Sequence, residues 1–312
     1  MSKISVIIVS WNARGYLRDC LASIRETGGG LVKEVIVVDN ASTDGSPDMV
    51  AEQFPETTLI RSGENLGFAR GNNLGIKRAS GTILALINSD VVVHPGCFQK
   101  LAAFLEANPK VALAGPKVMG RDGRPQLTCG RLPTVWNTVC QFLALGRIFP
   151  RWRWFDGFEM RHWDPDQPAD VEVLSGCFWL ARGEAVKQVG GLDERFFFYA
   201  EDVDWCKRFG DAGWKIAFAP EATATHFGGG SSGNAPLRYS IEILRANLLY
   251  WKKHHGSLGR GAYYVLALTW HSLRFAVRAL LKLGGLAKGD ETQLRLKEHL
   301  ACVRWLLTGR GV

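Results

Sequence analysis

The sequence ISVIIVSWN at residues 4–12 combines a short β-branched run, Ile4–Val9, with the polar group Ser10-Trp11-Asn12. Similar runs follow at Val35–Val38, Thr58–Ile60 and Ile83–Ile87. Short apolar runs of this kind are typical of strands buried on both faces of a parallel sheet.

Helical segments separate these runs. We expect them at Tyr16–Arg25, Pro47–Gln53, Phe68–Ala79 and Gly96–Asn108, with a fifth strand at Val111–Val118. The alternation predicts an α/β fold: a Rossmann-like, mainly parallel sheet flanked by helices, with right-handed crossovers.

Residues 121–168 break the alternation, being rich in Arg, Trp, Pro and Asp. We expect a long excursion over the acceptor side of the domain, with a plain surface insertion as the alternative. The later elements are expected in this order: strands Val171–Leu174 and Phe178–Ala181, helix Glu201–Ala212, strand Trp214–Ala219 and a flexible loop at Gly228–Gly233.

The C-terminal region, residues 236–312, is expected to be helical and basic, after a catalytic domain at 1–235. Between Arg238 and Arg310 there are 13 Lys and Arg but 4 Asp and Glu, within a chain of net charge +8. Such a surface can meet nucleic acid, phospholipid or a phosphorylated substrate. No nucleic-acid partner is expected, because the Arg/Trp stretches contain no recognisable recognition module.

Two helices are expected in this region, at Ile241–His254 and Tyr263–Leu283. The uncharged run Gly261–Leu273 is shorter than the roughly 20 residues that span a bilayer. The second helix has a basic stripe opposite an apolar side, and it is predicted to lie on an anionic membrane surface or, alternatively, to pack on the catalytic domain. The stripe consists of Arg274, Arg278 and Lys282, and the other side of Val265, Leu268, Ala276, Ala279 and Leu283.

The amino-acid composition and the absence of certain sequence motifs exclude several classes of protein. With 46% hydrophobic and 22% charged residues, the chain is an ordinary globular one. Seven scattered cysteines without a C-x-x-C pair argue against a cysteine zinc site or a disulfide framework and favour a reducing, cytoplasmic location. The first apolar run is too short for a signal peptide. The strand ends carry no G-x-G-x-x-G and no P-loop, which disfavours dinucleotide dehydrogenases and P-loop NTPases.

Polar residues follow the predicted strands. Asp39 and Asn40 can hold a base N–H and a ribose hydroxyl, while Ser46 before Pro47 is typical of a helix cap. Asp90 follows the fourth strand and is a candidate ligand for a divalent cation, or else a turn residue.

A second acidic cluster follows the aromatic run Phe196–Tyr199. Glu201, Asp202 and Asp204 open a helix, where an ionised carboxylate in a dry cleft can act as general base. The alternative is an ordinary acidic helix start beside core aromatics. His226 is a possible metal ligand or a structural histidine.

These motifs together resemble family 2 glycosyltransferases of the GT-A fold, nearest to their bacterial rhamnosyltransferase-like branch. The resemblance covers about three quarters of the chain and rests on residues 5–12, 37–46, 65–73, 87–90, 175–178, 191–194, 201–204 and His226. It implies an inverting transfer of a sugar, in one branch rhamnose, from a dTDP- or UDP-linked donor. It also implies Mg²⁺ or Mn²⁺ as cofactor and a glycan or lipid-linked acceptor of the cell envelope, at the inner face of the plasma membrane.

The resemblance also implies roles for matched positions. Asp202 would be the general base, supported by Glu201 and Asp204, while Asp90 and His226 would hold the metal. The acceptor would meet Ser175, Gly176 and Trp205. The donor site would comprise Ser10, Asn12, Asp39, Asn40, Asn65, Gly67, Arg70, Asn73, Asn88, Ser89 and Asp90. Asn88 replaces the first acid of the family's D-x-D motif, a departure that bears on metal affinity.

Three other functions fit parts of the sequence. A sugar-1-phosphate nucleotidyltransferase would need a glycine-rich, lysine-bearing loop after the first strand, which Ser10–Tyr16 lacks. A glycoside hydrolase could use the pair Glu201 and Asp204 but would not need Asp39 and Asp90. A non-catalytic nucleotide-sugar-binding protein at the membrane would not need Asp90, Asp202 and His226 together.

Overall fold

A mixed sheet forms the centre of the computed structural model, which describes residues 3–149, 152–160, 163–228, 236–286 and 289–310. Its strands run in the order β3-β2-β1-β4-β10-β6-β11-β5, with β8 added on β11, while β7 and β9 form a separate pair. The strands are β1 (Ile4–Ser10), β2 (Val32–Asp39), β3 (Thr58–Arg61), β4 (Ile83–Asn88), β5 (Val91–Val93), β6 (Val111–Met119), β7 (Cys129–Gly130), β8 (Ala169–Val171), β9 (Val173–Leu174), β10 (Phe178–Arg182) and β11 (Lys215–His226).

The sheet is mainly parallel in the half formed by its first four strands. β3, β2, β1 and β4 pair in parallel, as do β6 and β11. β10 runs antiparallel between β4 and β6, and β5 and β8 run antiparallel to β11. The first four strands therefore end at one common edge, where ligands bind in open α/β sheets.

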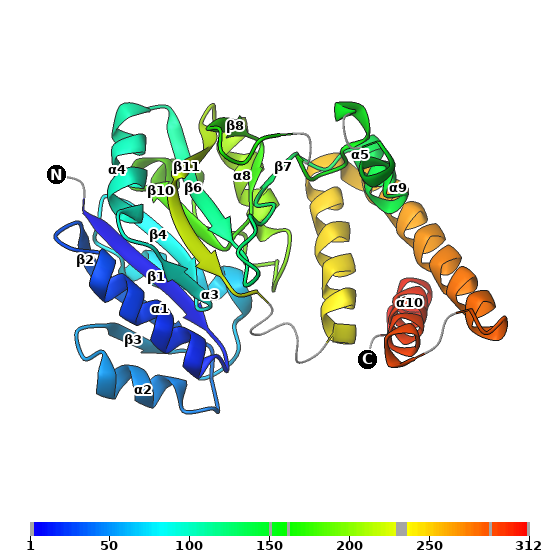
Figure 1. Ribbon diagram of the computed structural model, residues 1–312, viewed down its shortest axis with the longest axis horizontal. Helices are drawn as coiled ribbons and strands as arrows, with labels where there is room; N and C mark the ends of the chain where they lie inside the picture. The colour runs from blue at the N-terminus through cyan, green and yellow to red at the C-terminus, as the bar shows by residue number, and fades with distance from the viewer. Residues whose placement is uncertain (1–2, 150–151, 161–162, 229–235, 287–288, 311–312) are drawn as a thin grey trace.

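Helices cover both faces of the sheet, as the alternating sequence predicts. α1, α2 and α4 pack on one face, and α3, α7 and α8 on the other. Figure 1 shows α9 and α10 beyond α8 and β7, beside the sheet. The helices are α1 (Arg14–Thr27), α2 (Ser46–Gln53), α3 (Gly67–Arg78), α4 (Cys97–Ala107), α5 (Val135–Phe142), α6 (Leu145–Ile148), α7 (Gly183–Val189), α8 (Glu201–Asp211), α9 (Pro236–Leu283), α10 (Asp290–Thr308) and the 3₁₀ turn η1 (Arg153–Phe155).

Several elements differ from the sequence prediction. The strand expected at Trp214–Ala219 continues as β11 to His226, because its second part gains β5 as an antiparallel partner. The excursion at 121–168 contains α5, α6 and η1, and α10 was not expected. The two helices expected after residue 236 are halves of α9, which meet at a kink where Gly256 has φ of 68°.

The boundary expected at 235/236 falls at the start of α9 and stays a prediction. Residues 229–233 of the expected glycine loop lie outside the described residues.

The structure divides the predicted basic stripe of α9, because Arg274 and Arg278 are half-buried whereas Lys282 is exposed; contact of this helix with a membrane stays a prediction. Arg274 stacks on Trp270, with its guanidinium carbon 4.2 Å from the ring centroid, and the arginine side faces α10. Val265 and Leu283, predicted on the apolar side opposite the stripe, are 59% and 84% exposed. Cation–π stacking and the long aliphatic stems of arginine allow these residues to cover an apolar neighbour.

No helix in the described ranges is long and apolar enough to cross a membrane.

Candidate active site

A cleft of about 280 Å³ opens at the carboxyl ends of the parallel strands. Segments far apart in the sequence meet there, because β1, β2 and β4 end at the same edge and the start of α8 faces them. The residues singled out from the sequence that line this cleft are Asn40, Asn65, Gly67, Asn88, Ser89, Asp90, Ser175, Gly176, Glu201, Asp202 and His226.

Two buried side-chain oxygens that have no hydrogen-bond partner in the described part of the chain lie at the end of β2, where the sequence predicts the site of the sugar donor. Asn40 donates its side-chain N–H to the Gly67 carbonyl at 3.0 Å, and Asp39 Oδ2 accepts from the Ser42 N–H at 3.2 Å. Asp39 Oδ1 and Asn40 Oδ1 are buried without a partner among the described residues. Buried acceptors of this kind are costly unless a ligand supplies donors, and a nucleoside offers base N–H and ribose O–H groups.

Gly67 allows its segment of the chain to lie directly against the aromatic run Phe196–Tyr199. Its φ is +75°, and a Cβ there would lie 2.3 Å from the Phe197 carbonyl oxygen. The next residue, Phe68, donates its N–H to the same oxygen at 2.8 Å. Only glycine combines this left-handed conformation with so close an approach.

Five predicted donor residues do not line the cleft. The side-chain oxygen of Asn12 accepts from the Thr43 N–H at 2.7 Å and so joins two strand-end turns. Arg70 is exposed and pairs with Glu64 at 3.8 Å. The others are Ser10 and Asp39, which are buried at the ends of β1 and β2, and Asn73.

Asn73 has a structural role instead. Its side-chain amide exchanges two hydrogen bonds with the backbone of Leu192, at 2.8 and 2.9 Å. The residue is buried and joins α3 to the loop before the aromatic run, which corrects its expected place in the donor site.

Asp90 and His226 meet across the junction of β5 and β11. Asp90 Oδ1 lies 3.2 Å from His226 Nε2, and Gln126 lies 3.0 Å from the other ring nitrogen. A carboxylate and an imidazole suit Mg²⁺ or Mn²⁺, whose remaining ligands can come from a diphosphate and water. No group of three or more His, Cys, Asp or Glu that could hold a metal occurs within the described ranges. Asp90 and His226 are thus two candidate ligands, and a cation held by them would need further ligands from a diphosphate and water.

Asp202 faces the cleft from the first turn of α8. Its Oδ2 accepts from the Gly176 N–H at 3.3 Å and its Oδ1 from the Val203 N–H at 2.8 Å. Burial raises the pKa of Asp202. A carboxylate of raised basicity that remains within reach of the cleft can accept a proton from a hydroxyl.

Glu201 is buried beside Asp202. Burial, followed by the Asp202 charge and then by Glu242 of α9, raises the pKa of Glu201 well above its ordinary value. Its Oε2 has no hydrogen-bond partner among the described residues. Burial thus disfavours the charged form of both neighbouring carboxyl groups.

Asp204 and Trp205 point away from the cleft. Asp204 is fully buried between Arg208, Lys253 and His254, which all bond to its carboxylate. The Trp205 indole is also fully buried, packs 5.4 Å from Trp179 and donates to the Gly190 carbonyl. Trp205 therefore cannot contact an acceptor, and Asp204 touches neither Asp202 nor the cleft; both expectations are corrected.

Sequence reasoning missed Tyr239, which reaches the cleft from α9. It also assigned Phe197, Phe198 and Tyr199 only the exclusion of water, although all three line the cleft. Local sequence contains no signal for Tyr239, because its place depends on how α9 packs on α8.

A mainly parallel sheet flanked by helices, with a cleft at its carboxyl edge lined by Asp90, His226, Glu201 and Asp202, is the arrangement of the GT-A fold of glycosyltransferases. The chain belongs to glycosyl transferase family 2, whose family model matches residues 5–190.

Relatives and solved structures agree with this class. The chain is 28% identical over 266 residues to an N-acetylglucosaminyl-diphospho-decaprenol L-rhamnosyltransferase of Mycobacterium tuberculosis, covering 82% of this chain and 86% of that protein. It is 25% identical to the glycosyltransferase AglE of Haloferax volcanii, covering 91% and 82%. A mannosyltransferase of Pyrobaculum calidifontis, solved with GDP-Man and Mn²⁺, has a TM-score of 0.61 at 18% identity, covering 99% and 88%. The protein is thus a glycosyltransferase.

Proposed function

We propose that this protein is an inverting, metal-dependent glycosyltransferase that moves a sugar, with rhamnose the first to test, from a dTDP- or UDP-linked donor to a hydroxyl of a lipid-linked glycan. The observation that carries the proposal is that Asp90, His226 and Asp202 line one cleft, with Asp90 Oδ1 3.2 Å from His226 Nε2. The similarity to a rhamnosyltransferase named for a polyprenyl-diphosphate acceptor supports the donor and acceptor classes.

The reaction follows from the placement of the acids. Asp202 accepts the proton of the acceptor hydroxyl. At the same time the oxygen of that hydroxyl attacks the anomeric carbon of the donor sugar. The bond from that carbon to the diphosphate breaks, and its electron pair leaves on the nucleoside diphosphate. A single displacement of this kind inverts the anomeric configuration.

Asp90 and His226 would hold Mg²⁺ or Mn²⁺ beside the diphosphate. A bound cation there supplies charge neutralisation for the leaving group. The orphaned acceptors Asp39 Oδ1 and Asn40 Oδ1 would bind the nucleoside.

We also propose that the protein works as a peripheral protein at the inner face of the plasma membrane. The exposed side of the second half of α9 is apolar, with Leu273, Val277, Leu280 and Leu283 between 44% and 84% exposed. A second exposed group on the segment after α5 comprises Leu143, Ile148, Phe149, Trp152 and Trp154.

Cations accompany both apolar groups. Arg147 and Arg153 stand among the exposed residues after α5, and Arg260 and Lys282 are exposed on α9. Exposed leucines and tryptophans with interspersed Arg and Lys match an anionic bilayer surface, into which apolar side chains insert while cations meet lipid phosphates.

The test of the enzymatic proposal is a transfer assay. Purified protein is incubated with MnCl₂, dTDP-rhamnose or UDP-sugars, and N-acetylglucosaminyl-diphospho-farnesol. We expect one donor to give a product whose anomeric configuration, read by NMR, is opposite to that of the donor.

Asp202→Asn should lower kcat by about 10²–10⁴-fold, the usual contribution of a general base, while the affinity for the nucleoside diphosphate is retained. Full activity of this variant, or a retained anomeric configuration, would discard the mechanism.

A further inference from the structure

The first half of α9, from Pro236 to His255, packs along the catalytic helix α8 and the loop before it. Phe196 and Ala200 form a buried apolar cluster with Leu244, Tyr250 and Trp251 of α9. This half-helix lies beyond the residues matched by the family model, which end at 190. It is nevertheless part of the wall of the cleft.

Tyr239, near the start of α9, is the residue that reaches the cleft. Its ring lies 5.7 Å from that of Phe198 and 6.2 Å from that of Tyr199, both in edge-to-face arrangements. The three rings line the same cleft as Gly176 and Asp202. They form an aromatic wall next to the proposed base.

A polar group completes this side of the cleft. Glu201 is 5% exposed, lines the cleft, and has Oε2 without a partner among the described residues. An aromatic wall with one buried, unmatched polar atom suits a ring that presents C–H groups on its face and hydroxyls at its edge. A sugar has both.

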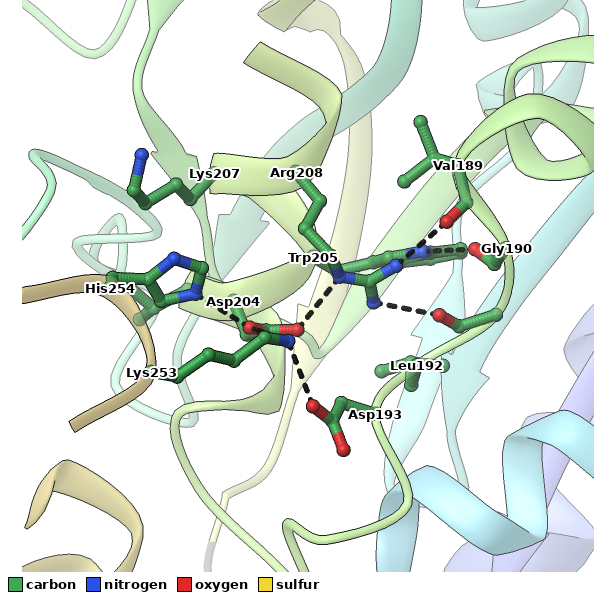
Figure 2. A network of polar contacts seen from close by, with 12 residues as sticks. Val189, Gly190, Leu192, Asp193, Asp204, Trp205, Lys207, Arg208, Lys253 and His254 are labelled. Atoms are coloured by element: carbon green, nitrogen blue, oxygen red, sulfur yellow. Dashed lines mark hydrogen bonds and ion pairs between the residues drawn. The ribbon is translucent and has the colours of Figure 1, made fainter. Parts of the chain in front are cut away.

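An ion cluster holds the far end of this half-helix on α8 (Figure 2). Lys253 Nζ lies 2.5 Å from Asp204 Oδ1 and 2.8 Å from Asp193 Oδ2. His254 Nε2 lies 2.7 Å from the same Asp204 oxygen. The other Asp204 oxygen, Oδ2, accepts from Arg208 Nε at 2.9 Å.

Arg208 extends the cluster into the preceding loop. Its other nitrogens donate to the carbonyls of Val189 and Gly191, at 3.0 and 2.7 Å. The cluster therefore ties three segments together: the loop at 189–193, the first turns of α8 and the end of the first half of α9.

We propose that α9 forms one wall of the acceptor subsite, with Tyr239 contacting the sugar ring of the acceptor, and that Lys253 and His254 are positioning residues that hold this wall through Asp204. This inference rests on the proposed function. It adds a substrate-contacting residue and two positioning residues from a region that the sequence indicated only as a basic tail.

The first experiment compares Tyr239→Leu, Tyr239→Phe and wild type, with N-acetylglucosaminyl-diphospho-farnesol as acceptor probe. Loss of the ring should raise the KM for this probe by about 3- to 10-fold, the range for an aromatic contact, whereas Tyr239→Phe should stay within about threefold. The dissociation constant for the nucleoside diphosphate with Mn²⁺ should not change, because Tyr239 is not among the residues proposed to bind the nucleoside or the cation. If Tyr239→Leu fails to fold, Tyr239→Trp replaces it and should change the same KM.

The second experiment tests the ion cluster with Lys253→Met, and with Lys252→Met as matched control, since Lys252 is an exposed neighbour outside the cluster. Lys253→Met should raise the acceptor KM as Tyr239→Leu does, and Lys253→Arg should restore it. In the double variant Tyr239→Leu/Lys253→Met, the increase in acceptor KM should be smaller than the product of the two single increases, because both changes act on the same wall of the cleft.

A role of the cluster in stability alone would lower the melting temperature and the active fraction but leave the acceptor KM unchanged, and that result would overturn the positioning role. If Tyr239→Leu still binds the nucleoside diphosphate and transfers sugar with an unchanged KM for the acceptor, α9 does not form a wall of the acceptor subsite. The proposed function would remain unaffected by that result. Wild-type protein that binds no nucleoside diphosphate and transfers no sugar would contradict the proposed function and this inference with it.

Discussion

The carboxylate of Asp90 lies 3.2 Å from Nε2 of His226, at the point where β5 pairs antiparallel with the end of β11. The two residues come from the middle and the last part of the catalytic domain. Their contact exists because only two residues separate the end of β4 from the start of β5, and β5 pairs with the last residues of β11, which places Asp90 beside His226. The proposed cation and diphosphate site depends on this one strand pairing.

Asp90→Asn is expected to weaken metal-dependent binding of UDP or dTDP. The amide keeps the size of the side chain but removes the charge that attracts a divalent cation, so affinity in MnCl₂ should fall by at least about tenfold, and by less in EDTA. Isothermal titration calorimetry with and without metal measures both values.

Asp48→Asn is the matched control for this change, because Asp48 is exposed on α2, outside the cleft, and pairs with Arg61 at the surface. Equal affinities for Asp90→Asn and Asp48→Asn in MnCl₂ would count against the assignment of Asp90.

The pH profile of transfer should report Asp202. Burial raises the pKa of its carboxyl above the ordinary 3.8, and a general base must be ionised to accept a proton. Activity should therefore be lost on acidification already above pH 3.8, in the acidic limb of kcat/KM. An acidic limb at or below that value, measured with enzyme shown to be folded by circular dichroism, would remove Asp202 from the role.

Asp204→Asn is expected to destabilise the protein by about 3–5 kcal/mol at neutral pH, because it leaves buried cations without their counter-charge. Burial alone would raise the pKa of Asp204, but hydrogen bonds from His254 and Lys253 lower it below the ordinary 3.8. The stabilisation is thus complete above pH 3.8 and is lost as the pH falls through the lower folded-state pKa.

Urea unfolding of wild type and Asp204→Asn from neutral to acidic pH measures this. The two curves should converge at the acid end. A difference that stays constant with pH would show that the carboxylate's charge is not what stabilises the fold.

The variant Trp205→Phe tests whether Trp205 is a core residue or a contact of the acceptor substrate. The change removes the hydrogen bond to Gly190 and leaves a gap against Trp179, so it should lower stability by about 2 kcal/mol. The KM for the acceptor should stay at the wild-type value, since the indole is fully buried. A raised acceptor KM with unchanged stability would restore Trp205 to the acceptor site.

Charge placed on the apolar side of α9 should release the protein from membranes. Val277→Asp and Leu280→Asp introduce acids on a face that is 44% and 68% exposed at these positions, so folding should be kept while insertion is opposed. Sedimentation with vesicles of phosphatidylcholine and phosphatidylglycerol measures binding, and pure phosphatidylcholine vesicles separate the electrostatic part.

Leu127→Asp, at another exposed leucine outside α9, is the control. Binding of Val277→Asp and Leu280→Asp equal to that of Leu127→Asp would refute docking through this face. Dimers seen in solution and broken by the same two changes would indicate a second copy of the chain as the occupant instead.

The sequence alone determined the alternation of strands and helices in the first half of the chain and the positions of most residues that line the cleft. Runs such as Ile4–Val9 are buried on both faces of the sheet. Such strands must be apolar whichever helices pack on them, so they can be recognised from the sequence. Polar residues directly after such strands, among them Asn40 and Asp90, must then lie at the common carboxyl edge.

Only the tertiary structure decided the roles of Asn73, Asp204 and Trp205, the orientation of α9 and the reach of Tyr239 into the cleft. A polar residue near a motif can face the ligand or satisfy a buried backbone group, and local sequence does not distinguish these outcomes. An amphipathic helix likewise shows two sides without saying which side is covered. Arg274 and Arg278 turn toward α10, and Leu273, Leu280 and Leu283 are left exposed. The partner that buries a helix face is chosen by packing between segments distant in the chain.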